Sequence, residues 1–322
     1  MEGPRSPRET ELPQIIDFLN KELRSEASWS IAAEYPTALT PNNLHNMRII
    51  ADDEKVLSHA VLKPLIIKSP HVIFKVGAIG SVVTDDQHRG QGLSTQVIND
   101  CLKSAQEQSC DIAILWTDLF DFYRRMGFEL AGSEVSFIIE DNFDVPNMNL
   151  RFSTDPKVAP DAIYRLYSSH SVNSVRTIEE TRKFLSIPQT KIYTAWEANG
   201  QLAAYAIEGK GIDLGGYIHE WGGSVPKLMA LLSFIRAKKD QPITVICPKH
   251  SQNLIRELQT KPVTVNNGFL GMIKLVNFDQ LAAKIKRAFR AEGVADIVLE
   301  KHPDHFVFGI GQDLFTINHE TD

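Results

Sequence analysis

Cysteine is scarce in this sequence, and long apolar runs are absent from it. The three cysteines, Cys101, Cys110 and Cys247, form no Cys-x-x-Cys pair and no metal-ligand spacing. This predicts reduced thiols and no bound metal. No apolar run is long enough to span a membrane, and residues 1–14 contain no apolar signal core. We therefore expect a cytoplasmic protein without a membrane partner.

Positive charge is also in short supply. The chain has 34 lysines and arginines against 40 aspartates and glutamates, a formal net charge of −6. Nucleic-acid binding depends on clustered positive charge, so this balance argues against a nucleic-acid partner. It is compatible with a cationic acceptor molecule. The 322 residues are enough for two domains and a third small piece.

One stretch combines a strand, a glycine turn and a helix. Residues 80–84 are small and β-branched, Gly90 and Gly92 follow, and the apolar residues of 93–108 recur with a period near 3.6. Glycine lets a backbone approach a ligand closely. The first N–H groups of a helix lack internal partners and carry positive partial charge. The stretch therefore predicts an anion site, most naturally for a phosphate or pyrophosphate.

The patterns around this turn predict an α+β, or mixed α/β, domain. Before the turn, the expected elements are a helix over 10–24, an irregular segment over 28–45, a hairpin over 47–69 with its turn at Asp52, Asp53 and Glu54, and a long strand over 71–85. After it, they are a buried strand over 110–118, a short helix over 119–130 that ends at Gly127, and a strand over 133–140.

The second half of the chain repeats this order of elements without repeating the residues. Residues 141–160 read as a connector. Two helices, a hairpin turning at Asn199 and Gly200, a strand, a helix, a strand, a helix and one closing strand over 263–276 follow. A helix and two or three strands end the chain. This suggests a diverged internal duplication. The predicted domains are 1–145, 146–270 and a small α/β segment over 271–322.

Two motifs in this order resemble the GCN5-related N-acetyltransferase (GNAT) family over about residues 10–140. The first is Gln87-x-x-Gly90-x-Gly92, and the second is the segment from Phe122 to Phe128. The resemblance implies a GNAT fold that transfers an acetyl group from acetyl-CoA to a primary amine, by direct attack in a ternary complex. The amine would belong to a small molecule or a peptide.

The resemblance also implies which residues hold acetyl-CoA. The pyrophosphate would lie on the turn and the helix start, at Arg89, Gly90, Gln91, Gly92, Leu93, Ser94 and Thr95. The pantetheine amides would pair with the strand at Val82, Val83 and Thr84. Asp118 and Leu119 would line the same cleft.

The resemblance implies that Tyr123 is the general acid, which protonates the departing thiolate. The other interpretation is a core tyrosine that packs beside Phe120 and Phe122. No unique base stands out: Glu34, Asp85, Asp86 and Asp118 are candidates, and a water chain is equally open. For the acceptor, Trp29, Glu34 and Tyr35 predict an aromatic and acidic wall around a cationic amine. The alternative is that Trp29 and Tyr35 only cover the core.

The second half has His219-Glu220-Trp221-Gly222-Gly223-Ser224 where a pyrophosphate loop should lie. The glutamate would repel phosphate, so we expect this half to bind no coenzyme A. The layout resembles the enhanced-intracellular-survival type of tandem-GNAT acetyltransferase, with a sterol-carrier-like remnant at the end. That resemblance implies that the carboxylate of Asp322 helps to deprotonate the amine, whereas a solvated polar tail is the other interpretation. A protein that binds acyl-CoA for regulation or interaction is the alternative function.

Overall fold

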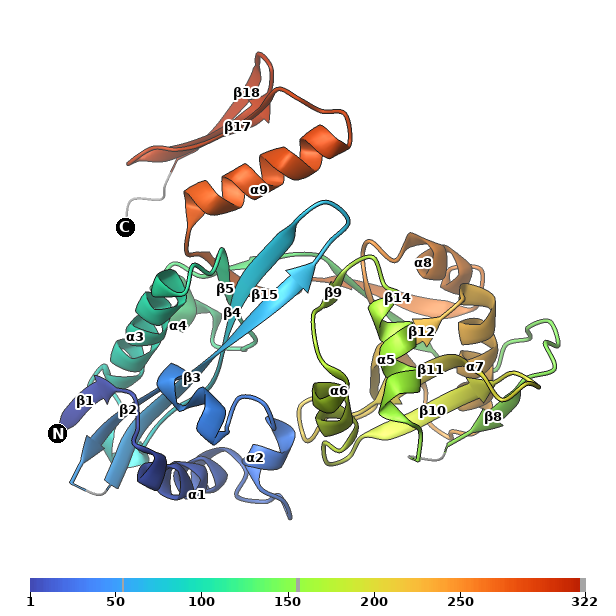
Figure 1. The fold of residues 1–322 in the computed structure, drawn as a ribbon, viewed down its shortest axis with the longest axis horizontal. Coiled ribbons are helices and arrows are strands. Elements are labelled where there is room, and N and C mark those ends of the chain that lie inside the picture. Colours follow the sequence, from blue (N-terminus) through green and yellow to red (C-terminus); the bar gives the residue numbers. More distant parts are fainter. Residues whose placement is uncertain (54, 155–156, 319–322) are drawn as a thin grey trace.

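The structure is a computed structural model that describes residues 1–53, 55–154 and 157–318. Its strands form an eight-stranded, a seven-stranded and a three-stranded sheet, here the first, second and third sheet (Figure 1). Glu54, which belongs to a turn expected from the sequence, lies outside the described residues. None of the described helices is both long and apolar enough to cross a membrane. The mixed α/β class predicted from the sequence is confirmed.

The first sheet carries the glycine turn. Its strands, in spatial order, are β1 (Glu2–Arg5), β2 (Met47–Asp52), β3 (Lys55–Lys68), β4 (Ile73–Thr84), β5 (Ile112–Leu115), β15 (Gly271–Leu275) and β6 (Glu129–Ala131), and β9 (Asn173–Ser174) pairs with β3. The strands β2, β3 and β4 are antiparallel neighbours, as the predicted hairpin and long strand require. β4 and β5 run parallel.

Helices cover both faces of the first sheet. On one face, α1 (Leu12–Leu23) and α2 (Ile31–Glu34) bury Ile15, Leu19 and Ile31 against β2 and β3. On the other face, α3 (Leu93–Glu107) and α4 (Phe120–Arg124) pack in a second apolar cluster. The helices predicted over 10–24, 93–108 and 119–130 are therefore confirmed. Three short 3-10 turns, η1 (Glu9–Glu11), η2 (Pro41–Asn46) and η3 (Asp86–His88), join these elements.

The second sheet repeats the arrangement. Its spatial order is β14 (Val263–Gly268), β7 (Glu134–Ile139), β13 (Ile243–Pro248), β12 (Tyr217–Gly223), β11 (Leu202–Glu208), β10 (Lys191–Trp196) and β8 (Arg151–Ser153). The helices α5 (Pro160–Ser168) and α6 (Ile178–Leu185) belong to one apolar cluster, and α7 (Val225–Ala237) and α8 (Gln252–Leu258) to another. Here β12 and β13 are the parallel pair, in the place that β4 and β5 hold in the first sheet.

The two large sheets exchange strands. β7, predicted as part of the catalytic domain, lies between β13 and β14 in the second sheet. The prediction of one closing strand over 263–276 is wrong, because β14 joins the second sheet and β15 joins the first. Gly271 makes the crossing possible, since an added Cβ would lie 2.9 Å from the carbonyl oxygen of Leu115. The domain limits after residues 145 and 270 stay a prediction.

The last segment is α9 (Phe278–Ala291) with the third sheet, β16 (Ile297–Lys301), β17 (His305–Ile310) and β18 (Asp313–Asn318). It lies at one end of the molecule, beyond the first sheet (Figure 1). The buried carboxylate of Asp111 anchors it: Asp111 accepts from Gln280 Nε2 at 2.8 Å and pairs with Lys284 Nζ at 2.6 Å. It also accepts from the backbone N–H of Lys75 on β4 at 2.7 Å.

This anchor gives a stability prediction. Replacing Asp111 by Ala leaves Lys284 and two further donors without their buried acceptor, so we expect a loss of about 3–5 kcal/mol in the free energy of unfolding. Urea denaturation measures it, and limited proteolysis should cut residues 278–318 faster. The matched control is Glu179→Ala, which breaks an exposed pair with Arg182 and should cost under about 1 kcal/mol. Equal losses in the two variants would contradict the anchor.

Candidate active site

The glycine turn leads directly into the first backbone N–H donors of α3. Gly90 and Gly92 have φ angles of +76° and +75°, in the left-handed region that favours glycine. A Cβ added to either glycine meets no atom within 4 Å. Glycine is therefore favoured here by the left-handed backbone conformation and not by a lack of space. Gly92 caps α3, and the N–H groups of Leu93, Ser94 and Thr95 form the first turn, which lacks intrahelical partners. The turn has the backbone geometry that the predicted anion cradle requires, and its binding of an anion stays a prediction.

Side chains fix this turn to the end of β4. The hydroxyls of Thr84 and Ser94 are 2.6 Å apart, and the hydroxyls of Ser58 and Thr84 are 2.9 Å apart. Arg89 is exposed and pairs with Asp86 at 2.5 Å, so its guanidinium is free to change partner when an anion arrives.

Asp85 caps η3 and stabilises the approach to the turn. Its carboxylate is paired with His88 Nδ1 at 2.7 Å and Lys55 Nζ at 2.9 Å, and it accepts from the N–H of Gln87. The bond to His88, then that to Lys55, lowers the pKa of Asp85 to about 2. A carboxylate held in this way is a poor proton acceptor near neutral pH, which weighs against Asp85 as the base.

β4 and β5 separate beside the turn. Their parallel pairing runs only from Val76 and Ile112 to Ala78 and Ile114. Beyond that point β4 continues to Thr84, paired with β3 on its other side. The backbone of 82–84 therefore presents an open strand edge, in the described part of the chain, to the space that β5 leaves. An extended molecule with amide groups can add to such an edge as a further strand.

A β-bulge shapes this open edge. The pairing of β3 with β4 skips from His59–Val83 to Val61–Gly80, so Ser81 and Val82 together face Ala60. Ser81 has a φ angle of +49°, which is unusual for a residue with a side chain. The bulge reverses which residues of β4 face α3 beyond it, since Val82 packs with α3 and Val83 with α1.

Tyr123 lies on α4, in the same apolar cluster as Val82 of β4. Its ring is 7% exposed and stands edge-on to Phe122 and Phe128, with ring centroids 4.9 and 5.9 Å away. Burial raises the pKa of its phenol, so the phenol keeps its proton at neutral pH. No hydrogen bond from the hydroxyl is found among the described residues. Tyr123 is thus both a packed core residue, as the alternative interpretation expected, and a protonated phenol whose hydroxyl has no hydrogen-bond partner among residues 1–53, 55–154 and 157–318.

The other predicted cleft residues follow β5 directly. Asp118 is exposed, and Leu119 is 61% exposed. The hydroxyl of Thr117 accepts from the N–H of Leu119 at 3.0 Å and so shapes the entry into α4. Their position where the two strands part agrees with the expected wall of the cleft, whose role stays a prediction.

Trp29, Glu34 and Tyr35 come together, but their polar atoms already have partners. The buried carboxylate of Glu34 accepts from Arg24 at 2.7 Å and from Trp29 Nε1 at 2.6 Å. The hydroxyl of Tyr35 donates to Asp213 at 2.5 Å, and Arg24 also pairs with Asp213 at 3.2 Å. As placed, this group joins α2 to the turn after β11 in the second half. An acceptor would have to displace these bonds to use Glu34 or Tyr35.

Sequence reasoning missed Arg24, Gly211 and Asp213 in this group. Arg24 and Asp213 are separated by 189 positions, so no local pattern links them. Gly211 is required because an added Cβ would lie 2.4 Å from Cδ of Glu34, and its φ angle is +58°. Asp322, whose carboxylate the resemblance brings to the site, lies outside the described residues.

The corresponding split in the second sheet is filled. β12 and β13 pair only at Tyr217–Thr244 and Ile218–Val245, and the indole of Trp221 then donates across the gap to the carbonyl of Ile246 at 3.0 Å. Pro226 stands in the first turn of α7 and removes one N–H donor. Glu220 is held by Arg176 at 2.7 Å. These contacts support the prediction of a single coenzyme A site.

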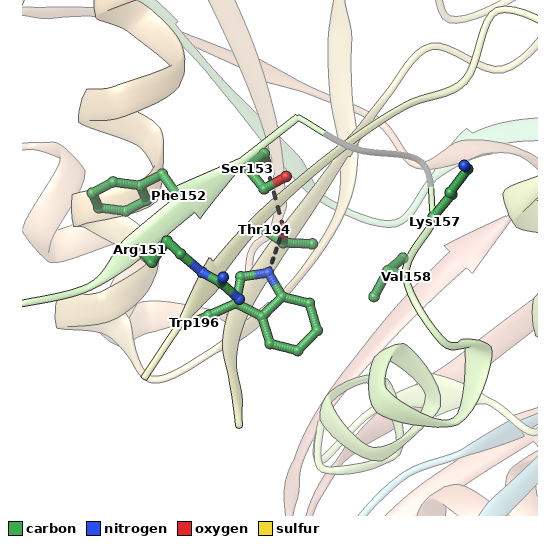
Figure 2. A pocket seen from close by; sticks show the side chains of 7 residues that line it. All are labelled: Arg151, Phe152, Ser153, Lys157, Val158, Thr194 and Trp196. Carbon is green, nitrogen blue, oxygen red and sulfur yellow. Dashed lines mark hydrogen bonds between the residues drawn. The ribbon is translucent and has the colours of Figure 1, made fainter. Parts of the chain in front are cut away.

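A hollow lies at the outer edge of the second sheet. It has a volume of about 330 Å³ and is lined by Arg151, Phe152, Ser153, Lys157, Val158, Thr194 and Trp196 (Figure 2). Trp196 Nε1 donates to the hydroxyl of Thr194 at 2.9 Å, which in turn donates to the carbonyl of Ser153. The hollow shares no lining residue with the site predicted from the sequence.

Comparison with known proteins decides the family of the first part of the chain. Residues 4–131 match the family model described as an acetyltransferase (GNAT) domain. These residues form a GNAT domain. A search of curated protein sequences finds no match. The family resemblance seen in the two motifs is thereby confirmed, and the glycine turn, the β4–β5 split and α4 all lie inside the GNAT domain.

Solved structures extend the likeness to the whole fold. A GCN5-related N-acetyltransferase from Anabaena variabilis superposes with a TM-score of 0.68 at 16% identity, over 98% of this chain and 85% of that one. One from Kribbella flavida gives 0.64 at 13%, over 98% and 83%. Eis1 from Mycobacterium abscessus gives 0.61 at 12%, over 99% and 85%. At such identities the likeness shows the fold alone.

The contact of Gly211 with the GNAT domain can be tested by adding one methyl group. Gly211→Ala places a Cβ against Glu34, so we expect a larger loss of unfolding free energy than the roughly 1–2 kcal/mol that left-handed strain costs alone. Gly200→Ala is the control, because Gly200 has a φ angle of +81° with open space around it. Denaturant midpoints of both variants isolate the contact, and equal midpoints would argue against it.

Proposed function

We propose that this protein is an acetyl-CoA-dependent N-acetyltransferase that acts on a primary amine in the cytoplasm. The observation that carries the proposal is the Gly90-Gln91-Gly92 turn at the start of α3, beside the open edge of β4, inside a GNAT domain. A pyrophosphate needs clustered N–H donors, and a pantetheine arm needs an unpaired strand edge. The two features lie next to each other here.

In this proposal the chain binds acetyl-CoA through its backbone. The N–H groups of 91–95 meet the pyrophosphate, and the exposed guanidinium of Arg89 adds positive charge beside them. The backbone of Val82, Val83 and Thr84 pairs with the amides of the pantetheine arm, and Asp118 and Leu119 form the facing wall. No described residues form a cluster of three or more metal-ligating side chains, and the proposed reaction needs no metal.

The reaction is an acyl transfer in a ternary complex. The nitrogen of the neutral amine attacks the thioester carbon, a C–N bond forms, and the C–S bond of the tetrahedral intermediate breaks. The Tyr123 hydroxyl gives its proton to the departing sulfur, a contribution of typically about 10²–10⁴-fold in rate. The raised pKa of Tyr123 keeps that proton available at neutral pH. The phenolate then regains a proton that the amine nitrogen loses.

The proton of the incoming ammonium leaves, we propose, through water. Glu34 is held by Arg24 and Trp29, and Asp85 is held by His88 and Lys55. These pairings occupy oxygen atoms of both carboxylates. The acceptor is a small-molecule or peptide amine, and no nucleic acid or membrane takes part. The three free cysteines, all buried, agree with a reducing compartment.

The same pairings favour one alternative. A protein that binds acyl-CoA but transfers little would keep the glycine turn and the open edge of β4, with the carboxylates of Glu34 and Asp85 held in ion pairs. This describes a regulatory or interaction protein with the same cofactor site.

Replacing Tyr123 by Phe separates the two functions. We expect acetyl-CoA affinity by calorimetry to stay within about threefold, because the hydroxyl bonds to nothing in the described residues. Turnover, measured as thiol release over a panel of diverse amines, should fall about 100-fold or more. Tyr217→Phe, on the exposed surface of the second half, is the control and should change neither quantity. Acetyl-CoA binding without turnover in the wild type would support the alternative, and no binding would exclude both.

A glycine pair tests the anion cradle. Gly92→Ala and Gly200→Ala both force a side chain into the left-handed region with no neighbour within 4 Å, so both should lose about 1–2 kcal/mol of stability. Only Gly92→Ala should weaken acetyl-CoA binding, by about tenfold, because only it moves the first N–H groups of α3. Calorimetry and urea denaturation of the two variants give the comparison. Equal affinities would remove the turn from the site.

A further inference from the structure

We propose that His59 is a positioning residue for acetyl transfer, which holds the bulge of β4 in the shape that acetyl-CoA requires. This inference rests on the proposed function. His59 lies in the middle of β3, fully buried, with Ile49 of β2 and Val83 of β4 as its paired neighbours. Both neighbours belong to the apolar cluster under α1, so the imidazole lies on that face of the sheet.

Within the described part of the chain, the imidazole makes one hydrogen bond, and that bond goes to the bulge. His59 Nδ1 is 2.8 Å from the carbonyl oxygen of Ser81. Ser81 is left out of the pairing between β3 and β4. A residue left out of the ladder loses a regular partner for its backbone groups. The buried side chain of His59 thus gives the carbonyl oxygen of Ser81 the hydrogen-bond donor that β3 does not provide.

The hydrogen-bond partner fixes the state of the ring. A carbonyl oxygen only accepts, so Nδ1 carries the proton and donates it. Burial lowers the pKa of His59 to about 4, so the ring is neutral at neutral pH and Nε2 holds a lone pair. Nε2 is buried without a hydrogen-bond partner among the described residues. A neutral histidine with a single donated bond is therefore what the site holds.

Stability alone would favour another residue here. A buried nitrogen without a partner loses its bonds to water and gains nothing in return. A leucine in the same apolar surroundings would avoid that loss. A leucine could not donate a hydrogen bond to Ser81, whereas the ring N–H of a histidine or a similar donor can. The unfavourable burial of Nε2 is thus offset by the hydrogen bond that holds the bulge.

The bulge matters because it sets the register of the cofactor strand. Side chains alternate along a strand, and one inserted residue reverses the faces of all that follow. Val82 and Thr84 point to the α3 side because of the bulge, and Thr84 there bonds to Ser94 at the start of α3. If Ser81 returned to regular pairing, Val82–Thr84 would slip by one position. The open edge and the anion cradle would then lose their alignment.

Three substitutions at one position test the inference. In His59→Asn, the amide nitrogen takes the place of Nδ1 and can donate to Ser81. In His59→Gln, the amide reaches the place of Nε2 instead, and His59→Leu has no donor. We expect the acetyl-CoA dissociation constant, measured by calorimetry, to rise about tenfold or more for Leu and Gln. Asn should stay within about threefold of the wild type. KM for acetyl-CoA should follow, with kcat at saturation changing less.

A matched control separates the role of the Ser81 bond from the general effect of replacing a buried histidine. His219 is half-buried on β12 in the second sheet, and its Nε2 lies 3.0 Å from the carbonyl oxygen of Gly209, so it makes a similar bond in the other half of the chain. His219→Leu should lower thermal stability and leave acetyl-CoA affinity unchanged. A folded His59→Leu with wild-type affinity would overturn the inference. If His59→Leu does not fold, the Asn and Gln variants decide, and equal affinities of those two would overturn it.

Failure of this inference is distinct from failure of the proposed function. If the wild type binds acetyl-CoA and transfers acetyl groups while His59→Leu does both equally well, only the role of His59 is lost. If the wild type binds no acetyl-CoA, the proposed function falls, and the role of His59 falls with it.

Discussion

The structure depends on two parallel strands that part. β4 and β5 stay paired from Val76–Ile112 to Ala78–Ile114 and then separate, while β3 holds the other side of β4 as far as Thr84. Backbone groups inside a protein are expensive to leave unpaired. A split of this kind therefore persists only where something else, protein or ligand, meets the open edge. The glycine turn, the start of α3 and the helix that carries Tyr123 all lie around it.

In the second sheet, side chains of the chain itself fill the corresponding split. There the indole of Trp221 crosses from β12 to the carbonyl of Ile246. A proline in the first turn of α7 takes the place of a donor, and Glu220 is used in an ion pair with Arg176. One architecture thus has two outcomes. The difference lies in which side chains the strand–turn–helix carries, because the backbone arrangement is shared.

The exchange of strands joins the two halves. β7 leaves the first half to complete the second sheet, and β15 returns to lie between β5 and β6. Arg24, Glu34 and Asp213 add an ionic contact between the halves, closed by Gly211. The face of the GNAT domain that carries α1 and α2 is therefore built partly by residues near position 210. An acceptor that binds on this face meets residues from both halves.

The sequence by itself determined the features that depend on residues close together along the chain. Periodicity located the helices, the two glycines marked the anion cradle, and Tyr123 fell in a recognisable segment, because each of these is a short-range pattern. It could not determine contacts between distant residues. The pairing of Arg24 with both Glu34 and Asp213, the departure of β7 and β15 to other sheets, and the bond from His59 to Ser81 were decided by tertiary structure. Each joins positions from 10 to 189 residues apart, and no local pattern records such a distance.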